Sequence, residues 1–487
     1  MRNIPQEVVK VAEKLQKKGF EAYLVGGCVR DLLLGKNPKD WDIATNAIPE
    51  KVQEIFPESV YENEFGTVGV KTDSGDPSLK VVEVTTYRWE GKYSDKRHPD
   101  RVQFAKTIKE DLSRRDFTIN ALALNLRTSQ VLNIVDACGG QEDLKNKVIR
   151  TVGDAEERFN EDALRLMRAV RLAAELDFGI EKKTAEAIRK NAHLLEMIAK
   201  ERIRDELIKL SMADGAADGI RIMANAGLLK YVMPELLEGV GVGQNKHHIY
   251  EVFEHNVRAL DYAAGKNYSL EVRLASLLHD VGKPHTKKGE GPDCTFYNHD
   301  VVGGKLTLKI LDRLHFSKKL TERVAHLVRY HLFYYNVGEV SEAGVRRLLR
   351  KVGPENIDDL IKVREADRIG SGVPKAVPYK LRHLLFMIEK VKKDPIDTRM
   401  LKLDGNDVMK LGELQPGPRV GQILAILLEA VLDNPQINDN EKLKERILDL
   451  NKLSDAELKT IAELAKKKKE EFESGQEAEI KKKHYVK

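Results

Sequence analysis

Cysteine and tryptophan are scarce in this 487-residue chain, which contains three cysteines and two tryptophans. Cys28, Cys138 and Cys294 stand far apart and form no Cys-x-x-Cys pair, which argues against a zinc knuckle or a disulfide framework. No apolar run is long enough for a signal peptide or a membrane span. We therefore expect a reducing, cytoplasmic setting and no membrane partner.

An excess of either charge is also lacking. The chain has 82 basic and 77 acidic residues and a formal net charge of +5, so a polyanionic partner is permitted but not required. The hydrophobic share of 41% and the charged share of 33% are typical of globular proteins. The chain is too long to fold around a single hydrophobic core, and its length favours about three domains of roughly 150 residues each.

The most informative stretch follows a short apolar strand, Tyr23 to Val25. Gly26 and Gly27 allow a backbone to approach a ligand closely, and Asp40 and Asp42 follow at a spacing of i, i+2. On a strand this spacing directs both carboxylates to one face, where they can bind Mg²⁺. A solvated Asp-x-Asp turn is the simpler interpretation of the pair alone, but the glycine turn favours a triphosphate site.

Further short strands are predicted at residues 67–71 and 80–86. Within the second, Glu83 alternates with valines and would lie on the face that carries Asp40 and Asp42, unless it simply faces solvent. The polar segment 88–99 has the composition of a mobile loop that would close on a substrate.

Two adjacent arginines, Arg114 and Arg115, precede an apolar run and call for an anionic partner, for which phosphate suits their forked donors best. From residue 154 the pattern is helical almost to the end, so strands are expected only in the N-terminal third and the fold class is α+β.

A helix is predicted over residues 161–171, and it places Asp162 and Arg165 on one face, with Arg168 one turn further on. A surface ion pair is the simpler interpretation of this pattern. Alternatively, a carboxylate acceptor beside a guanidinium donor can imitate the Watson–Crick edge of a base.

In this order and spacing, the motifs of residues 20–230 resemble the class II tRNA nucleotidyltransferase and poly(A) polymerase family. The resemblance assigns the catalytic motif to Gly26, Gly27, Arg30, Asp40 and Asp42. It assigns ribose and triphosphate binding to Arg114, Asp116 and Asn120, and an amino-acid template for the nucleotide base to Asp162 and Arg165, with Arg168 as a further nucleotide-binding residue.

The resemblance implies an α+β head with a small mixed sheet, followed by helical domains. The implied reaction is the addition of C, C and A to the tRNA 3′ end from CTP and ATP, with Mg²⁺ on Asp40 and Asp42 and release of pyrophosphate. A poly(A) polymerase and a specialised CC-adding or A-adding enzyme share these motifs and remain alternatives.

A second constellation comprises His255, His279, Asp280 and Asp367, and it resembles the HD phosphohydrolase superfamily. Imidazoles and carboxylates together suit Mn²⁺, Ni²⁺, Zn²⁺ or Fe, and His299 and His331 offer ligands for a second ion. The resemblance implies phosphatase or 2′,3′-cyclic phosphodiesterase activity on phosphorylated ends. An HD hydrolase whose N-terminal part only docks RNA is the alternative from another class.

The C-terminal part resembles the tail of the family, in which Gly417 and Arg419 would meet the tRNA backbone before a helix from residue 422. An ordinary packing element is equally consistent with these residues. The expected domains are a head (1–150), a neck (151–230), an HD domain (231–400), a tail (401–454) and a charged helix (455–487). The oligomeric state stays open.

Overall fold

The computed structural model describes residues 4–61, 66–90, 102–126, 133–245, 249–392 and 401–486. The chain forms two compact units, the first from residues 1–332 and 358–374 and the second from residues 333–357 and 375–487. Among the described residues, no helix has the length and apolar character needed to cross a bilayer. The finer division into five domains stays a prediction.

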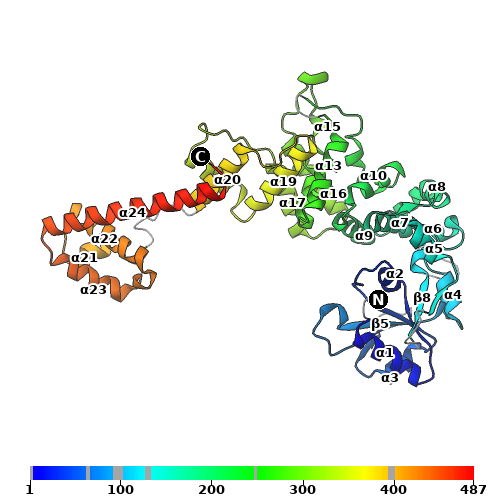
Figure 1. Ribbon diagram of the computed structural model, residues 1–487. Coiled ribbons are helices and arrows are strands. Elements are labelled where there is room, and N and C mark those ends of the chain that lie inside the picture. The colour runs from blue at the N-terminus through cyan, green and yellow to red at the C-terminus, as the bar shows by residue number, and fades with distance from the viewer. Residues whose placement is uncertain are drawn as a thin grey trace. The chain divides into compact units, whose positions relative to one another are not determined.

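A seven-stranded mixed sheet forms the N-terminal part of the first unit (Figure 1). Its order is β3-β4-β5-β2-β1-β8-β9, in which β2 and β5 are parallel and the other neighbours are antiparallel. The strands are β1 (Ala22–Val25), β2 (Asp42–Thr45), β3 (Ser59–Tyr61), β4 (Thr67–Lys71), β5 (Val81–Thr86), β8 (Leu122–Asn125) and β9 (Asn133–Asp136). The predicted α+β class and mixed sheet are confirmed.

Short helices pack around this sheet: α1 (Gln6–Lys17), α2 (Gly27–Leu33), α3 (Pro49–Ile55), α4 (Ile108–Ser113) and α5 (Gly140–Asn146). Helix α1 buries one apolar stripe, including Val8 and Leu15, and ends before Gly19, whose φ of +88° suits glycine. The start of the expected loop at 88–99 is instead a strand, since β6 (Arg88–Glu90) pairs with β7 (Val102–Phe104). Residues 91–101 lie outside the described part.

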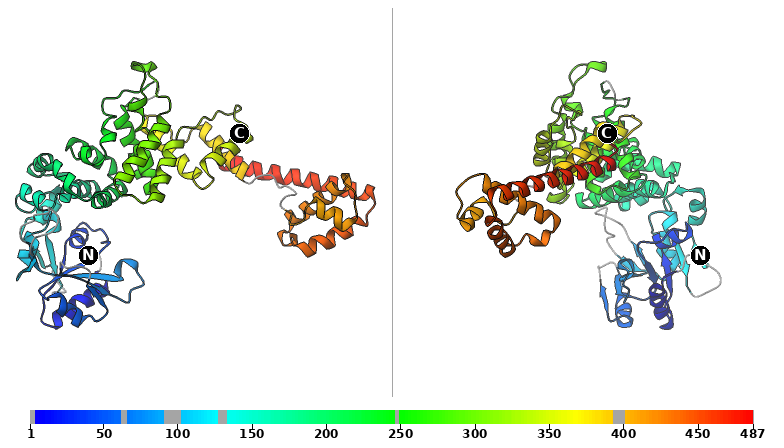
Figure 2. Two further views of the ribbon diagram at one scale, coloured as in Figure 1. Left: turned by 180° about the vertical axis from the view of Figure 1, so that it is seen from behind. Right: turned by 60° about the vertical axis from the view of Figure 1, so that its left-hand side comes forward.

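Helices account for nearly all of the regular secondary structure in the described chain after residue 154 (Figure 2). One exception corrects the expectation that strands stay in the N-terminal third: β11 (Gly179–Ile180) pairs in parallel with β10 (Val148–Ile149). The helices of the first unit that carry the argument are α6 (Ala155–Glu161), α7 (Leu164–Leu176), α9 (Lys200–Met212), α13 (Val252–Gly265), α14 (Leu270–Leu278), α16 (His299–Arg313), α17 (Lys318–Tyr330) and α19 (Ile357–Gly370).

A buried arginine joins the neck helices to the helices that follow. The Arg273 side chain on α14 is fully buried and donates to the carbonyl oxygens of Ser211 and Ala213, at the end of α9, at 3.0 and 3.1 Å. It also donates to the carbonyl of Ala264 on α13. Because these carbonyls lie at helix C-termini, where partial negative charge collects, the guanidinium fixes the C-terminal ends of α9 and α13 to α14.

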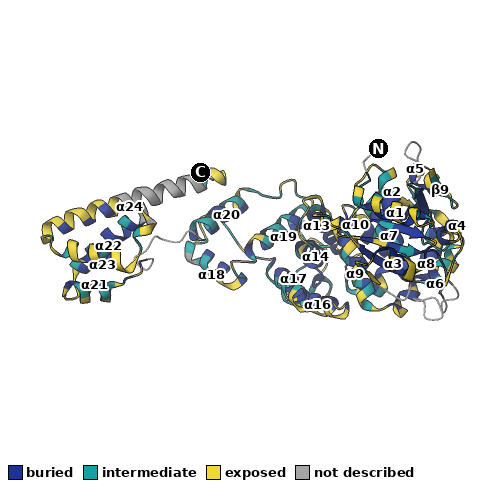
Figure 3. Ribbon diagram, turned by 90° about the horizontal axis from the view of Figure 1, so that it is seen from below, coloured by how far each residue is buried: buried dark blue, intermediate teal, exposed yellow. Residues whose placement is uncertain are grey.

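The second unit has its own core, built around α22 (Pro418–Asp433), which α21 (Gly405–Gly412), α23 (Asn440–Asn451) and α24 (Asp455–Lys483) enclose (Figure 3). Helix α22 begins at Pro418 and not at residue 422, because proline suits the first helical position. Helices α18 (Glu342–Val352) and α20 (Tyr379–Lys392) pack against each other in the same unit.

Candidate active sites

The turn between β1 and α2 requires glycine at one of its two glycine positions. Gly26 has a φ of +76°, and a Cβ there would lie 2.8 Å from Nη1 of Arg115. Gly27 has ordinary backbone geometry, and a Cβ there would meet only Nη2 of Arg30 at 3.7 Å. The predicted close approach therefore belongs to Gly26, and the group that approaches is an arginine side chain.

The two aspartates do not both lie on the strand. Strand β2 begins at Asp42, whereas Asp40 is exposed and lies in the segment before it, and the intervening Trp41 is buried. The expectation of two strand carboxylates is thus wrong for Asp40. In the parallel register Asp42 pairs with Glu83 on β5, so these two side chains do share a face, as predicted.

Burial raises the pKa of Asp42, and the charge of Asp40 raises it further, while Arg115 acts in the opposite direction. Two carboxylates and one guanidinium leave net negative charge in a partly buried place. A divalent cation bound to the oxygens of Asp40 and Asp42 would relieve it, so the donor set fits Mg²⁺.

A buried carboxylate, Asp111 on α4, holds both members of the predicted arginine pair. Arg114 pairs with one oxygen at 2.7 Å and Arg115 with the other at 3.2 Å. Arg115, which the sequence analysis did not select as a site residue, is the member beside Gly26 and Asp42. Adjacent arginines could not be told apart without knowing which one the glycine turn would face.

A polar network links the head to the neck. Arg30 donates to Oδ1 of Asn120 at 2.9 Å, and Asn120 donates to Asp116 at 3.4 Å. Asp116 accepts two hydrogen bonds from Arg168 on α7, at 2.8 and 2.6 Å. Four residues predicted to bind the nucleotide therefore form one chain of contacts across the two parts.

Three of these residues, Arg30, Asn120 and Arg168, border a cleft of about 800 Å³ between the head and the neck, which Gly27, Asp40 and Asp42 also line. Lys36, Lys39, Arg171 and Lys209 also line it and were not predicted as site residues. Six further predicted site residues do not line it: Gly26, Glu83, Arg114, Asp116, Asp162 and Arg165. The sequence could not identify these four basic residues as part of a site, because lysines and arginines are frequent throughout the chain.

The predicted helix over residues 161–171 is wrong at its N-terminal end. Helix α6 ends at Glu161, α7 begins at Leu164, and Asp162 lies between them with extended backbone. The Asp162 carboxylate accepts the N–H of Leu164 at 3.1 Å, which is the capping contact that disfavours aspartate inside helices.

The two side chains proposed as a base template have separate partners. Asp162 pairs with Arg202 on α9 at 2.8 Å. Arg165 is buried and pairs with Glu161 at 2.5 Å, while it also donates to the carbonyl of Arg158. Each side chain is therefore held in a fixed orientation, which a template for a base requires.

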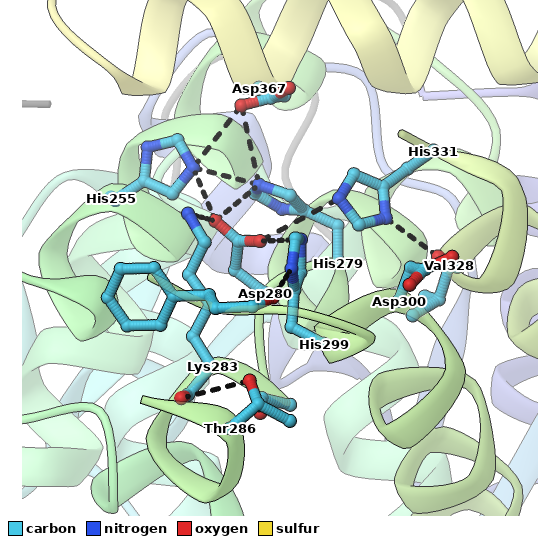
Figure 4. Close-up of polar contacts among 12 residues, drawn as sticks. His255, His279, Asp280, Lys283, Thr286, His299, Asp300, Val328, His331 and Asp367 are labelled. Carbon is cyan, nitrogen blue, oxygen red and sulfur yellow. Dashed lines mark hydrogen bonds and ion pairs between the residues drawn. The ribbon is translucent and has the colours of Figure 1, made fainter. Parts of the chain in front are cut away.

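The second constellation converges as predicted (Figure 4). His255, His279 and Asp367 place ligand atoms within 4.8 Å of one another, and so do Asp280, His299 and His331. All six side chains are buried. Asp280 connects the groups, because one oxygen lies 3.1 Å from Nε2 of His255 and the other lies 3.4 Å from Nε2 of His299.

Backbone carbonyls fix which imidazole nitrogen is available. Nδ1 of His279, His299 and His331 lies 2.8, 2.6 and 2.7 Å from the carbonyl oxygens of Ser276, Phe296 and Val328. Each Nδ1 therefore carries the proton and donates it, which leaves Nε2 for a metal. The imidazole and carboxylate donors in two connected groups fit a pair of transition-metal ions.

Burial and the neighbouring charged groups shift the pKa values of the histidines in this cluster. Burial disfavours the charged form of His279, but Asp280 and Asp367 outweigh it and raise the pKa to about 10, so a metal ion that binds Nε2 must displace a proton from it. Burial and the neighbouring His279 lower the pKa of His331 to about 3. Nearby Lys283 pairs with Asp280 at 2.6 Å. Burial opposes the charge of both carboxylates, but Lys283 and the histidines hold the pKa of Asp280, and the histidines and Arg364 that of Asp367, well below the usual range, so both are charged at neutral pH.

The RNA-contact residues predicted in the tail have structural roles. Arg419 donates to the carbonyl oxygens of Asn451 and Leu453, at 2.9 and 2.7 Å, where α23 ends, and it also pairs with Asp455. Gly417 precedes α22 in an extended conformation that other residues adopt as well. Contact with RNA at either residue stays a prediction.

Comparisons with known proteins agree with this architecture. Family models match residues 22–150 (Poly A polymerase head domain), 177–239 (Probable RNA and SrmB-binding site of polymerase A) and 252–371 (HD domain). The CCA-adding enzyme of Lactococcus lactis subsp. lactis (strain IL1403) is 34% identical over 446 residues, which cover 90% of this chain and 96% of the relative.

Solved structures give the same result. The Bacillus stearothermophilus CCA-adding enzyme in complex with CTP has a TM-score of 0.59 and 28% identity, over 92% of this chain and 97% of that one. The Thermotoga maritima CCA-adding enzyme complexed with tRNA, at 22% identity and a TM-score of 0.51 over 92% and 96% of the two chains, shares the fold.

Proposed function

The chain belongs to the family of CCA-adding enzymes, which are nucleotidyltransferases, and we propose that it adds C, C and A in turn to the 3′ end of tRNA, using CTP and ATP. One observation carries the proposal: Asp40 and Asp42 share a single cleft with Arg30, Asn120 and Arg168. Carboxylates for a metal thus face cations for a triphosphate. With tRNA as the substrate, we place the protein in the cytoplasm.

Members of both matched enzyme families use divalent metal ions. At the head, Asp40 and Asp42 would hold Mg²⁺, with Glu83 beside Asp42 in the sheet. Mg²⁺ there would neutralise the triphosphate and favour the deprotonated 3′ hydroxyl of tRNA. The ions at the second site are expected to be Mn²⁺, Ni²⁺, Zn²⁺ or Fe.

The side chains of the cleft position the nucleotide. Arg30, fixed by Asn120, and Arg168, fixed by Asp116, offer donors to the ribose and phosphates. Arg165 and Asp162 would read the base edge, and GTP and UTP would be refused because they present the wrong donor and acceptor pattern. Arg115 would balance charge at Asp42.

Replacement of one carboxylate tests the transferase assignment. In Asp42→Ala, CTP incorporation into a tRNA that lacks its CCA end should fall by more than about 1000-fold, because a metal-binding oxygen is lost. Binding of that tRNA, measured by fluorescence anisotropy, should be unchanged. Activity within tenfold of the wild type would refute the role of Asp42.

The same assay separates the alternatives. Purified protein is given CTP, ATP or both, and the products are sized to single nucleotides. A CCA-adding enzyme adds two residues with CTP and stops after one further residue with both. A long A tail with ATP alone would identify a poly(A) polymerase, and a product that stops after CC would identify a CC-adding enzyme.

The six-residue cluster favours a second activity, phosphohydrolysis at phosphorylated ends, for which 2′,3′-cyclic phosphodiesterase and phosphatase reactions are the candidates. His255, His279, Asp280, Asp367, His299 and His331 would hold the metal ions. The full-length chain, incubated with 2′,3′-cyclic AMP and Ni²⁺ or Mn²⁺, should show turnover that His279→Ala abolishes. No turnover of cyclic or monoester phosphates with any divalent ion would overturn this activity.

A further inference from the structure

Arg273 brings a positive charge into the interior that no carboxylate balances by direct contact. Its side chain is fully buried, and within the described part of the chain it forms no ion pair. Its five acceptors are neutral: the carbonyl oxygens of Ser211, Ala213, Ala264 and Tyr268, and Oδ1 of Asn267. A buried charge is costly, and a neutral side chain of similar size would fill this space at a lower cost. The charge itself therefore needs a reason beyond packing.

The end of α9 that Arg273 contacts forms part of the wall of the transferase cleft, where it contributes Ile208, Lys209, Met212, Ala213 and Asp214. Helix α9 ends at Met212, and the unpaired carbonyl groups of a helix C-terminus carry about half a negative charge. Asp214, which is exposed, adds a full negative charge. Lys209 lies 3.8 Å from the buried Glu206 carboxylate, which offsets its charge. This part of the wall would therefore repel a triphosphate unless another cation compensated it.

The side chains that line the cleft are closely balanced in charge, since six are basic and five are acidic. A nucleoside triphosphate is strongly anionic, so one further positive charge changes the potential that it meets in the cleft. A buried charge acts over a longer distance than an exposed one, because water and salt screen it less. Burial lowers the pKa of Arg273 and the charge of Asp214 opposes this shift, so the two groups interact through the wall.

We propose that Arg273 is a positioning residue of the transferase site. Its guanidinium holds the end of α9 in the cleft wall and offsets the negative charge of that end and of Asp214, so that the cleft accepts a nucleoside triphosphate. The inference rests on the proposed transferase function and adds a residue from outside the head and neck. Arg273 lies in the segment 252–371 that matches the HD domain, so this domain completes a cleft between two others.

Steady-state CTP incorporation by the full-length chain tests the role of the charge. Arg273→Met should raise the KM for CTP about tenfold and leave kcat within about threefold of the wild type, because ground-state binding of the triphosphate is weakened. Arg273→Lys keeps the charge, so its KM should stay within about threefold of the wild type. Arg189→Met, at an exposed arginine of the neck that does not line the cleft, is the control. An unchanged KM in Arg273→Met, or an equal increase in Arg273→Lys, would overturn the proposal.

Asp214 separates the electrostatic role from a purely structural one. Asp214→Asn should lower the KM for CTP about threefold, and in the Arg273→Met background it should return the KM towards the wild-type value. Asp205→Asn is the matched control, because Asp205 lies on α9, pairs with Arg204 and does not line the cleft. A double variant with the KM of Arg273→Met would refute charge compensation. If Arg273→Met does not fold, Asp214→Asn decides alone, and an unchanged or higher KM overturns the proposal.

Salt provides a second measurement of the same effect. The difference in KM between the wild type and Asp214→Asn should be smaller at about 0.5 M KCl than at about 0.05 M, because salt screens an exposed carboxylate. A difference that does not depend on salt would contradict the electrostatic explanation. Failure of the wild type to incorporate CTP into a tRNA that lacks its CCA end would overturn the transferase function itself. Incorporation by the wild type with an unchanged KM in Arg273→Met overturns only the role of Arg273.

Discussion

Asp116 shows how one residue joins the head to the neck. Burial opposes its charged form, but Arg168 and Arg165 outweigh burial and hold the pKa at about 2. Since this value lies below that of an unfolded aspartate, the charge stabilises the fold at neutral pH. The stabilisation is complete above about pH 4 and disappears as the pH falls towards 2.

The resulting prediction concerns acid stability. At pH 7, Asp116→Asn should lower the free energy of unfolding by about 2 kcal/mol, which corresponds to the shift from 3.8 to about 2. Urea denaturation of both proteins at several pH values checks this. The difference in the free energy of unfolding between the wild type and Asp116→Asn should become smaller below about pH 4. A difference that stays constant down to about pH 2 would contradict the ion-pair explanation.

Arg165 leads to a prediction about nucleotide choice. Arg165→Ala should lower the preference for CTP and ATP over UTP and GTP by about 10- to 100-fold, because a base-reading donor is lost. Glu161→Ala should have a smaller effect of the same kind, since Glu161 fixes Arg165. Single-nucleotide incorporation rates give the ratios, with Arg189→Ala as control. Unaltered selectivity in Arg165→Ala would rule out its template role.

At the scale of elements, the turn from β1 into α2 offers a matched pair of variants. Gly26→Ala places a Cβ against Arg115 at a φ of +76° and should destabilise the protein by about 1–3 kcal/mol. Gly27→Ala should cost less than about 1 kcal/mol or even stabilise α2. Thermal unfolding measures both, and equal effects would show that the turn does not depend on Gly26.

The sequence predicted elements well where a pattern was local and poorly where partners were distant. Short apolar or alternating runs located β1, β4 and β5, and the clustered histidines were found because His279-Asp280 is a distinctive pair. The break at Asp162 was missed because its cause is a capping contact and a pairing with Arg202 on another helix. The sequence predicted an anionic partner for the pair Arg114 and Arg115, but only the folded chain shows that Arg115 is the member beside Gly26 and Asp42.

At the scale of the whole molecule, both candidate metal sites belong to the first of two compact units. A metal ion that binds only folded protein should therefore stabilise that unit alone. At a free Mn²⁺ concentration 100 times Kd, the gain is about 2.7 kcal/mol.

Calorimetry of the full-length chain should show two unfolding transitions, and Mn²⁺ should raise the melting temperature of only one of them. His279→Ala should abolish the part of this increase that comes from the second site. A single transition, or an equal shift of both transitions in the wild type, would be inconsistent with two units that unfold independently.

The path of the chain between the two units determines when, during translation, all six side chains of the cluster have been synthesised. The chain leaves the first unit after Leu332, builds α18 in the second, and returns at Asp358 to supply Asp367. Five of the six clustered side chains are therefore synthesised before a segment that folds elsewhere, and the sixth comes after it. The head and neck can fold early during translation, whereas the metal centre must wait for the chain to return.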